Sequence, residues 1–323
     1  MTITRRGFLA GTGAVLSATA LPAASMDTWQ IEGPAFGASW RVRVAAAVDV
    51  AAIVSAITDV VASVEAAMSP FRPTSEISRF NATETTDWLP LSPATLTTLS
   101  EAKRFAGLTK GAFDPTLGGL VGRYGFGPIT QQPAGSFDDL ALNPDGARKG
   151  HMMQTLDLCG IAKGHALDRI ATALTTLGHD AFFVELGGEV YGQGAHPEGR
   201  PWRAGVERPL PGPTAVQRIV VLAGEALATS GDLFNSYTHG GHRYCHIIDP
   251  RRKLPADTAL ASVSVFAPRA ITADALATAF FAMGSPLGQE FAEREGIAAL
   301  FVLRDGADLR EVATADFSTR IIR

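Results

Sequence analysis

The order of its strand-like and helix-like segments constrains the fold of this chain more than any other feature of the sequence. Between residues 181 and 266, short segments with strand character follow one another, separated by turns rich in glycine and proline. These segments are 181–186, 189–194, 202–207, 217–222, 242–248 and 261–266. Strands joined by short turns pair antiparallel, because a parallel pair needs a long crossover connection. The pattern therefore predicts a largely antiparallel sheet.

Helical patterns lie on both sides of these strands. Apolar residues recur every three or four positions from Val48 to Met68, which is typical of an amphipathic helix. Ser92-Pro93 is a typical helix start for a segment that runs towards Ala106. Further helices are expected where an apolar pattern ends at glycine, and further strands at 38–46 and in a C-terminal pair. The predicted helices are 164–177, 271–283 and 286–295. Separate helices packed on antiparallel strands favour an α+β fold.

Composition excludes several classes of protein. Hydrophobic residues make up 46% of the 323 residues and charged residues 19%, which is enough apolar material for a large core and argues against disorder. The 28 basic and 32 acidic side chains give a net charge of −4 without long runs of either sign, so no nucleic-acid partner is expected. Cys159 and Cys245 are the two cysteines. They exclude a disulfide-rich scaffold, and the sequence leaves open whether they pair.

Residues 1–25 have the layout of an export signal. Arg5 and Arg6 precede an apolar stretch that reaches Leu21, and small residues follow at 23–25. Paired arginines before a weakly apolar stretch resemble a twin-arginine signal. A membrane anchor is the alternative, but the stretch is shorter and less apolar than a span requires. We expect a periplasmic protein whose single domain comprises residues 26–323.

Two segments could form parts of a ligand site, the first beside a large planar ligand or another stretch of backbone and the second at an anion. In the first, an Asp-Pro turn after Phe113 aims the carboxylate of Asp114, and the neighbouring glycines allow close approach of a ligand. In the second, residues 156–168, a strand is expected to end in a turn at Gly160, with Lys163 at the start of a helix. Free amides at a helix start and a lysine form an anion site. The alternatives are an ordinary glycine-rich loop and a lysine that extends along a helix end.

A third segment, residues 228–250, is rich in histidine. His239, His242, Cys245 and His246 invite a zinc interpretation, but strand alternation would place the last two on opposite faces of a strand. His246 lies three residues before Asp249 and is the better candidate for proton transfer. A surface histidine is the alternative.

The fourth segment pairs a carboxylate with a hydroxyl group. Asp274 and Thr278 are four residues apart on a predicted helix that is otherwise rich in alanine and phenylalanine, so they share one face. Placing both groups in apolar surroundings is unfavourable unless a hard cation lies between them. Oxygen ligands of this kind suit Mg²⁺. The alternative is that Asp274 caps the helix.

Taken together, these segments resemble the FAD:protein FMN transferase family, also called the ApbE family. The matching stretches occur in the family's order over most of residues 26–323. They are MSPFRPTSEISRFN, GAFDPTLGGLVGRYGFG, LDLCGIAKGHALDRIA, VELGGEVYGQG, TSGD, RYCHIIDP and ADALATAFFAMG. The resemblance implies an α+β, T-fold-like enzyme that uses FAD and Mg²⁺. It would attach FMN to a serine or threonine hydroxyl of a target protein and release AMP.

The resemblance also implies roles for individual residues. Phe36 and Phe71 would face the flavin, and Mg²⁺ would be held by the carbonyl of Gly160 and the side chains of Asp274 and Thr278. The remaining FAD contacts are expected from Ala112, Phe113, Asp114, Asp157, Lys163 and Ile248.

Catalysis requires neutralisation of phosphate charge and removal of a proton from the acceptor hydroxyl. Mg²⁺ and Lys163 would supply the first. For the second, His246 and the nearby carboxylate of Asp249 are both candidates. Two other functions remain open from the sequence: a periplasmic FAD carrier without catalysis, and a pyrophosphatase that converts FAD to FMN and AMP.

The resemblance further implies a kind of partner. Members of the family modify flavoprotein subunits of membrane redox complexes. Members with twin-arginine signals include NosX-like proteins linked to nitrous oxide reduction, which makes a NosR-like acceptor one candidate. The sequence does not indicate an oligomeric state.

Overall fold

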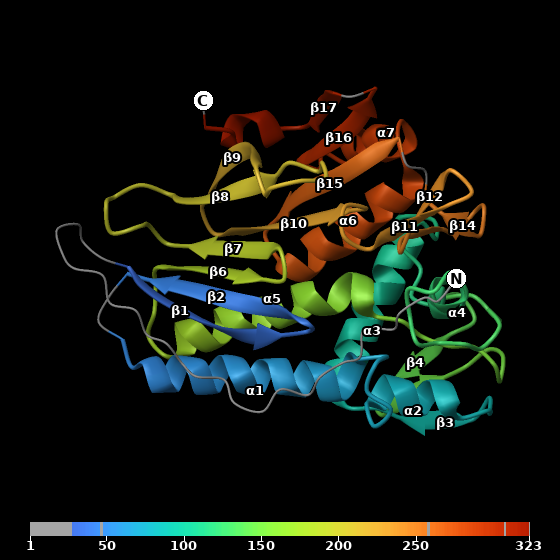
Figure 1. Cartoon of the computed structure of the whole chain (residues 1–323). Coiled ribbons are helices and arrows are strands. Elements are labelled where there is room, and N and C mark those ends of the chain that lie inside the picture. Colours follow the sequence, from blue (N-terminus) through green and yellow to red (C-terminus); the bar gives the residue numbers. More distant parts are fainter. Residues whose placement is uncertain (1–27, 46–47, 257–258, 307, 323) are drawn as a thin grey trace, which may run out of the picture.

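An eight-stranded antiparallel sheet runs through the centre of the protein (Figure 1). The computed structural model describes residues 28–45, 48–256, 259–306 and 308–322; the predicted signal at 1–25 lies outside them. The strand order is β1-β2-β6-β7-β10-β15-β16-β17, with every neighbouring pair antiparallel. The strands are β1 (Trp29–Ala35), β2 (Ala38–Val44), β6 (Phe182–Leu186), β7 (Glu189–Gln193), β10 (Glu225–Gly231), β15 (Leu260–Ala267), β16 (Ala299–Asp305) and β17 (Asp308–Thr314). The predicted α+β class and antiparallel pairing are confirmed.

Helices cover one face of this sheet. α5 (Cys159–Thr176) and α6 (Ala270–Met283) lie against the strands, and α1 (Val50–Met68) packs on the outer side of α5 (Figure 1). α3 (Pro93–Leu108) contacts all three helices. The main hydrophobic core fills the space between sheet and helices. The candidate site lies where α5 and α6 bring polar side chains to this sheet.

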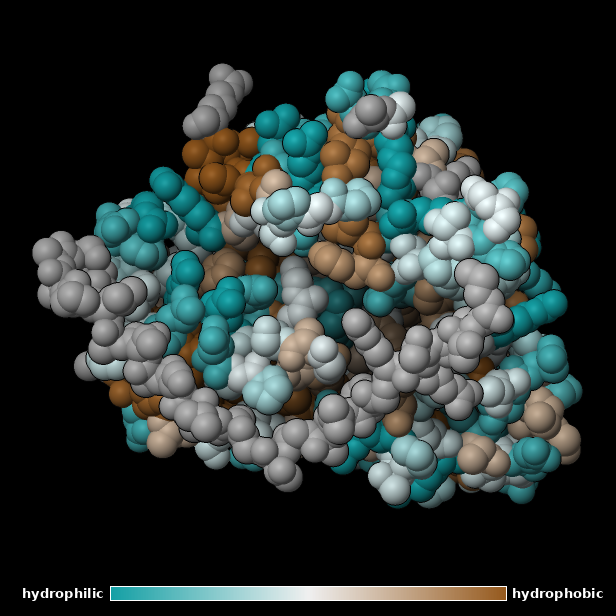
Figure 2. Space-filling view, viewed as in Figure 1, coloured by the Kyte–Doolittle hydropathy of each residue, from teal (hydrophilic) through white to brown (hydrophobic). Residues whose placement is uncertain are grey.

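A smaller hydrophobic core covers the other face of the sheet. The hairpin β8 (Trp202–Glu207) and β9 (Val216–Leu222) packs there with the 3₁₀ helix Phe317–Arg320. All eight residues of β15 are buried, because a central strand covered on both faces has no solvent side. Where Figure 2 is not grey, hydrophilic residues are interspersed with smaller hydrophobic groups on the surface, as is usual for a surface that faces water.

Short elements surround this framework. They are β3 (Trp88–Pro90), β4 (Ala141–Asn143), β5 (Gly146–Arg148), β11 (Ser236–His239), β12 (His242–Cys245), β13 (Ile248–Asp249), β14 (Leu254–Pro255), α2 (Glu76–Ala82), α4 (Gly118–Arg123) and α7 (Leu287–Arg294). The strands form one three-stranded sheet, β3-β5-β4, and two hairpins, β11–β12 and β13–β14. The hairpin β11–β12 and α4 lie on the same side of the molecule, near the end of β10 and the start of β15 (Figure 1).

Two sequence predictions were wrong in local structure. No strand precedes Gly160, and α5 begins at Cys159 and not at Gly164. The helix starts early because the carboxylate of Asp157 accepts a hydrogen bond from the amide of Cys159 (2.9 Å), which satisfies an amide that a helix start leaves free. The predicted strand 242–248 is broken after Cys245. His246 therefore lies in a short connection and not in a strand.

Among the described residues, α1 is the one helix whose length and apolar composition would allow it to cross a membrane. One face of it is buried in the main core, and this face consists of Ile53, Ile57, Val60, Val61, Val64, Ala67 and Met68. The spacing of these residues is that of one side of an amphipathic helix. α1 is therefore part of the folded domain.

The contact between α5 and α6 fixes the position of the candidate site. A Cβ atom on Gly164 would lie 2.4 Å from the carbonyl oxygen of Ala270, so only glycine allows the two helices to approach this closely. The carboxylate of Asp168 accepts hydrogen bonds from the amides of Ala270 (2.6 Å) and Ile271 (3.2 Å), which satisfies two free amides at the start of α6.

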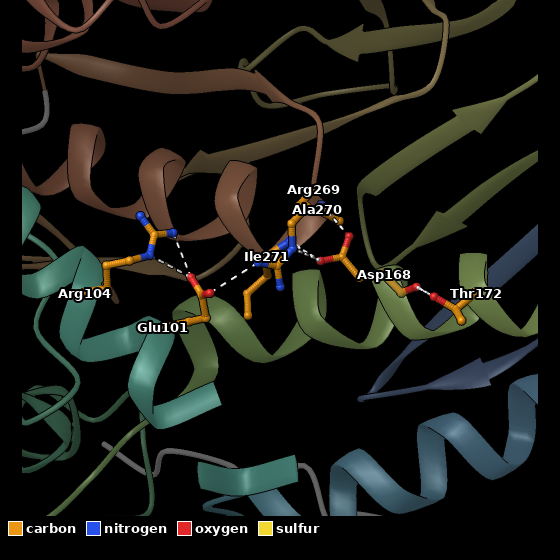
Figure 3. A network of polar contacts seen from close by, with 7 residues as sticks. All are labelled: Glu101, Arg104, Asp168, Thr172, Arg269, Ala270 and Ile271. Carbon is orange, nitrogen blue, oxygen red and sulfur yellow. Dashed lines mark hydrogen bonds and ion pairs between the residues drawn. The ribbon is translucent and has the colours of Figure 1, made fainter. Parts of the chain in front are cut away.

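A polar network extends this contact to α3. In Figure 3, Glu101 of α3 lies between Arg104 of the same helix and Arg269, which immediately precedes α6. Arg269 also lies 3.7 Å from the carboxylate of Asp168. The network therefore joins α3, α5 and the start of α6.

We predict that Gly164→Ala destabilises the protein. The added methyl group meets backbone atoms that cannot move aside, and overpacking of this kind costs about 1–3 kcal/mol in the free energy of unfolding. Gly107→Ala is the control, because a Cβ atom there meets nothing within 4 Å and alanine favours the helix. Urea unfolding of both variants tests the prediction, and equal stabilities would contradict it.

Candidate active site

A cavity of about 680 Å³ opens between the starts of α5, β7 and β8 and the ends of β10 and α6. Its volume lies within the range typical of small-molecule sites. The cavity brings together most of the residues that the sequence analysis singled out. Those that line it are Ala112, Phe113, Asp114, Asp157, Gly160, Lys163, His246, Ile248, Asp274 and Thr278.

Three of the predicted site residues do not line this cavity. Phe36 is partly buried against the main core, and the side chain of Phe71 is 64% exposed on the connection from α1 to α2. Asp249 is buried, and both oxygens of its carboxylate accept hydrogen bonds from the guanidinium of Arg251 (3.0 and 2.9 Å). A carboxylate held in this way is poorly placed to take a proton from a ligand in the cavity.

Asp114 shapes one wall of the cavity. Its Oδ1 accepts hydrogen bonds from the amide (2.8 Å) and hydroxyl (2.6 Å) of Thr116, which is the expected turn after Phe113. Burial raises the pKa of Asp114, although the bonds to Thr116 act in the opposite direction. The wall is continued by Asp157, whose backbone amide donates to the carbonyl of Pro115 (2.7 Å).

Lys163 forms an ion pair inside the cavity. Its Nζ lies 2.5 Å from Oε1 of Glu189, a side chain that is only 2% exposed. Burial alone would lower the pKa of Lys163, but the carboxylates of Glu189 and Asp274 raise it above its usual value. Burial raises the pKa of Glu189, and the ammonium of Lys163 offsets part of this rise. Lys163 is therefore a fixed positive charge in the cavity.

Asp274, Thr278 and Gly160 form a group of oxygen atoms beside this lysine. Asp274 lies in the second turn of α6 and does not cap it; its Oδ2 accepts a hydrogen bond from the amide of Gly164 (2.8 Å). The hydroxyl of Thr278 lies 3.4 Å from the carbonyl oxygen of Gly160. Burial raises the pKa of Asp274, although Lys163 and the amide of Gly164 lower it. The predicted shared face of Asp274 and Thr278 is therefore directed at the start of α5.

His246 also lines the cavity and lies immediately after β12. Its backbone amide donates to the carbonyl of Asn235 (3.1 Å), and its ring meets that of Phe126 edge-on at 6.4 Å. Burial lowers the pKa of His246 below 6.5. The imidazole is therefore neutral at pH 7 and able to accept a proton.

Several charged residues line the cavity that were not predicted from the sequence as site residues. Glu189 follows the two glycines of the turn between β6 and β7, and only the fold brings it to Lys163. Arg41, Arg43 and Arg203 also line the cavity. The first two are alternate residues of β2, so the sequence did contain a signal for a shared basic face. Positive side chains in a cleft attract anionic ligands.

The cysteines and histidines of the third segment do not form a metal site. Among the described residues no group of three or more His, Cys, Asp or Glu side chains could hold a metal ion. Cys159 is exposed and Cys245 is buried, and both are free thiols. His239 and His242 face each other at the end of the hairpin β11–β12. The zinc interpretation finds no support in this geometry.

Comparison with known proteins assigns the family. The profile of the ApbE family matches residues 36–301. This chain belongs to the ApbE family. The FAD:protein FMN transferase of Vibrio cholerae is 34% identical over 304 residues, which cover 89% of this chain and 91% of that protein. The FAD:protein FMN transferase of Salmonella typhimurium is 31% identical, and the match covers 94% of this chain and 91% of that protein.

Solved structures of ApbE proteins share the fold. The flavin transferase ApbE from Vibrio cholerae superimposes with a TM-score of 0.82 at 30% identity, covering 91% of this chain and 99% of that one. The apo flavinyl transferase ApbE from Pseudomonas stutzeri gives a TM-score of 0.81 at 29% identity, with 91% and 96% covered. The family resemblance and the predicted fold are therefore confirmed for this ApbE-family chain.

The TSGD motif of this ApbE-family chain anchors one wall of the cavity. Its Asp232 is fully buried, and the carboxylate pairs with the guanidinium groups of Arg243 (3.0 Å) and Arg304. These contacts connect the end of β10 to β12 and β16. They hold the connection that carries Leu233, Phe234 and Asn235 against the cavity.

We predict that Asp232→Asn lowers the free energy of unfolding by about 1.5–3 kcal/mol, because it removes charge-assisted hydrogen bonds to a fully buried carboxylate. Asp316→Asn is the matched control: Asp316 pairs with Arg320 on the surface, with 61% of its side chain exposed, where such pairs contribute about 1 kcal/mol or less. Chemical unfolding measures both. A cost at Asp232 no larger than that at Asp316 would contradict the role of Asp232.

Proposed function

We propose that this chain transfers FMN from FAD to a serine or threonine hydroxyl of an acceptor protein and releases AMP, with Mg²⁺ as the metal. Membership of the ApbE family supports the transferase activity. The observation that carries the proposal is the position of Lys163 beside Asp274, in the same cavity wall as Gly160 and Thr278. Fixed positive charge and hard oxygen ligands at one point are what cleavage of a pyrophosphate requires.

The residues present fit a divalent cation. Asp274 is buried in the otherwise apolar helix α6, and only one of its oxygens, Oδ2, takes the amide of Gly164. The hydroxyl of Ser230 lies 3.4 Å from that of Thr278, which adds a further oxygen. Asp274, Thr278 and the carbonyl of Gly160 would hold Mg²⁺, which prefers few protein oxygens completed by water and phosphate. When bound, the ion would neutralise charge on the phosphate oxygens.

The other charged residues of the cavity orient the substrate. Lys163, held by Glu189, would bind the phosphates of FAD, and Arg43 and Arg203 would draw the anionic dinucleotide into the cavity. Arg41 is already paired with Glu32 (3.3 Å) and Glu185 (3.1 Å). The acceptor oxygen would attack the phosphorus of the FMN half. A new phosphoester bond forms, the bond to the AMP oxygen breaks, and AMP leaves with the electron pair.

His246 is the residue to which we assign acceptance of the hydroxyl proton. It lines the cavity, whereas the other candidate, Asp249, is paired with Arg251 outside it. Burial keeps the imidazole neutral, so it can take the proton as the oxygen attacks.

We also propose the setting in which the chain acts. The twin-arginine-type signal at 1–25 would export the folded protein to the periplasm. There the acceptor would be a flavoprotein subunit of a membrane redox complex, with a NosR-like protein as one candidate.

We predict that Asp274→Asn loses transfer activity by at least about 100-fold while the protein stays folded, because the change removes the charge that a cation needs. Purified protein is incubated with FAD, Mg²⁺ and a candidate acceptor, and the acceptor mass is measured. FMN on the acceptor indicates transfer, free FMN a pyrophosphatase, and unchanged FAD a carrier. Asp316→Asn, on the surface, is the control. Full activity of Asp274→Asn in Mg²⁺ would refute the proposed cation site.

We predict that the acidic limb of the pH–rate profile has its midpoint at a lower pH than a free imidazole would give. The pKa of His246 is lowered by burial, so the ring loses its proton at a lower pH than a free imidazole, and the rate falls only when the pH drops below that lowered value. His246→Gln should slow transfer and remove this acidic limb while FAD fluorescence titration shows binding retained. An unchanged acidic limb in His246→Gln would exclude His246 as the proton acceptor.

A further inference from the structure

A second cavity, of about 460 Å³, continues from the first. Glu207, Leu233 and Phe234 line both cavities. One wall of the second cavity is the connection between β8 and β9, with Leu210, Pro211, Gly212 and Thr214, and the other is β11. We call this second cavity the β11 groove. It joins the first cavity, which His246 lines.

The β11 groove borders a strand that has a free edge. Ser236, Tyr237 and Thr238 are three consecutive residues of β11, and all of them line the groove. Ser236 and Thr238 share one face of β11, and Arg243, the cross-strand partner of Thr238, lines the groove with them. The groove therefore borders this face of the hairpin and reaches the strand at Tyr237. β11 pairs with β12 alone among the described strands, so alternate amides and carbonyls of its other edge have no strand partner.

A ladder of aromatic rings supports β11 beside the groove. Tyr237 stacks on Tyr244 of β12 (5.3 Å) and on Phe126 (5.3 Å), and Tyr244 stacks on Tyr124 (6.2 Å). Phe126 in turn meets the ring of His246. The ladder therefore links β11 to the proposed proton acceptor. Tyr237 is 43% exposed and Phe234, at the junction of the two cavities, is 75% exposed.

The charges of the groove do not favour an anionic ligand. Arg243 lines it, but its guanidinium is engaged by the side chain and carbonyl of Asp232, and Glu207 adds a carboxylate at the junction. What the groove and the free edge of β11 offer is unpaired backbone and exposed aromatic and apolar side chains. These are the features with which a strand edge binds an extended polypeptide.

We propose that the β11 groove holds the acceptor polypeptide, which pairs in an extended conformation with the free edge of β11 and places its hydroxyl residue in the first cavity beside His246. This inference rests on the proposed transfer of FMN to a protein hydroxyl, which requires a polypeptide to reach that point. The β11 groove is continuous with the first cavity through Glu207, Leu233 and Phe234. This continuity favours the acceptor polypeptide as the occupant over a second copy of the chain.

The test uses the full domain and a synthetic ten-residue peptide with one central threonine. Hydrogen–deuterium exchange with and without the peptide should show protection of alternate amides within 236–239, those that do not already pair with β12. Tyr237→Ala should raise the KM for the peptide about tenfold, as loss of an interface aromatic does, and change the Kd for FAD less than about twofold. Trp88→Ala is the matched control, because Trp88 is equally exposed, at 43%, on the distant strand β3, and it should change neither.

The outcomes separate the docking proposal from the transferase proposal. FMN on the peptide without protection at 236–239 supports the transferase and overturns the docking site. Protection without FMN on the peptide supports the docking site and counts against the chemistry. If Tyr237→Ala weakens FAD binding instead, the groove belongs to FAD, and the proposal is wrong. Near-UV circular dichroism of Tyr237→Ala shows whether the variant keeps its tertiary structure, and the exchange measurement on the unmodified protein does not depend on it.

Discussion

The close contact between α5 and α6 is the constraint on which the site depends. Gly164 allows the two helices to approach until its backbone amide donates to the carboxylate of Asp274 (2.8 Å), and Asp168 closes the contact at the start of α6. An amide within a helix normally donates to the carbonyl four residues earlier, which for Gly164 is Gly160. The hydrogen bond from the Gly164 amide to Asp274 competes with the helical bond to the Gly160 carbonyl. The hydroxyl of Thr278 approaches this same carbonyl oxygen.

The electrostatic balance of the site follows from the same contact. Asp274 and Glu189 are both almost fully buried, and burial of a carboxylate is unfavourable unless a cation or hydrogen-bond donors compensate it. Lys163 compensates part of this charge, since it forms an ion pair with Glu189 and interacts with Asp274. The second oxygen of Glu189 is buried without a hydrogen-bond partner among the described residues. A cavity with such groups is built to receive more positive charge together with a phosphate.

The sequence predicted those parts of the molecule that local patterns determine. Asp274 and Thr278 share one face of α6 because they are four residues apart on a helix. α3 begins after Ser92, as predicted, and the hydroxyl of Ser92 accepts a hydrogen bond from the amide of Thr95. The start of α5 was misplaced because its N-cap is Leu158, a residue that does not signal a helix start. The carboxylate of Asp157, one residue earlier, accepts the amide of Cys159. Glu189 could not be assigned from the sequence, since it meets Lys163 only when β7 lies beside α5. The sequence likewise did not show that the carboxylate of Asp249 pairs with the guanidinium of Arg251 and does not line the cavity.

The central claim is that Gly160, Asp274 and Thr278 together hold a divalent cation beside the phosphates of FAD. The most direct measurement is the anomalous scattering of Mn²⁺, in place of Mg²⁺, in a crystal of the protein with FAD. The account predicts one strong anomalous peak within coordination distance of Asp274, Thr278 and the carbonyl oxygen of Gly160. A peak elsewhere in the cavity, or FAD bound in full with no peak at these oxygens, would contradict it.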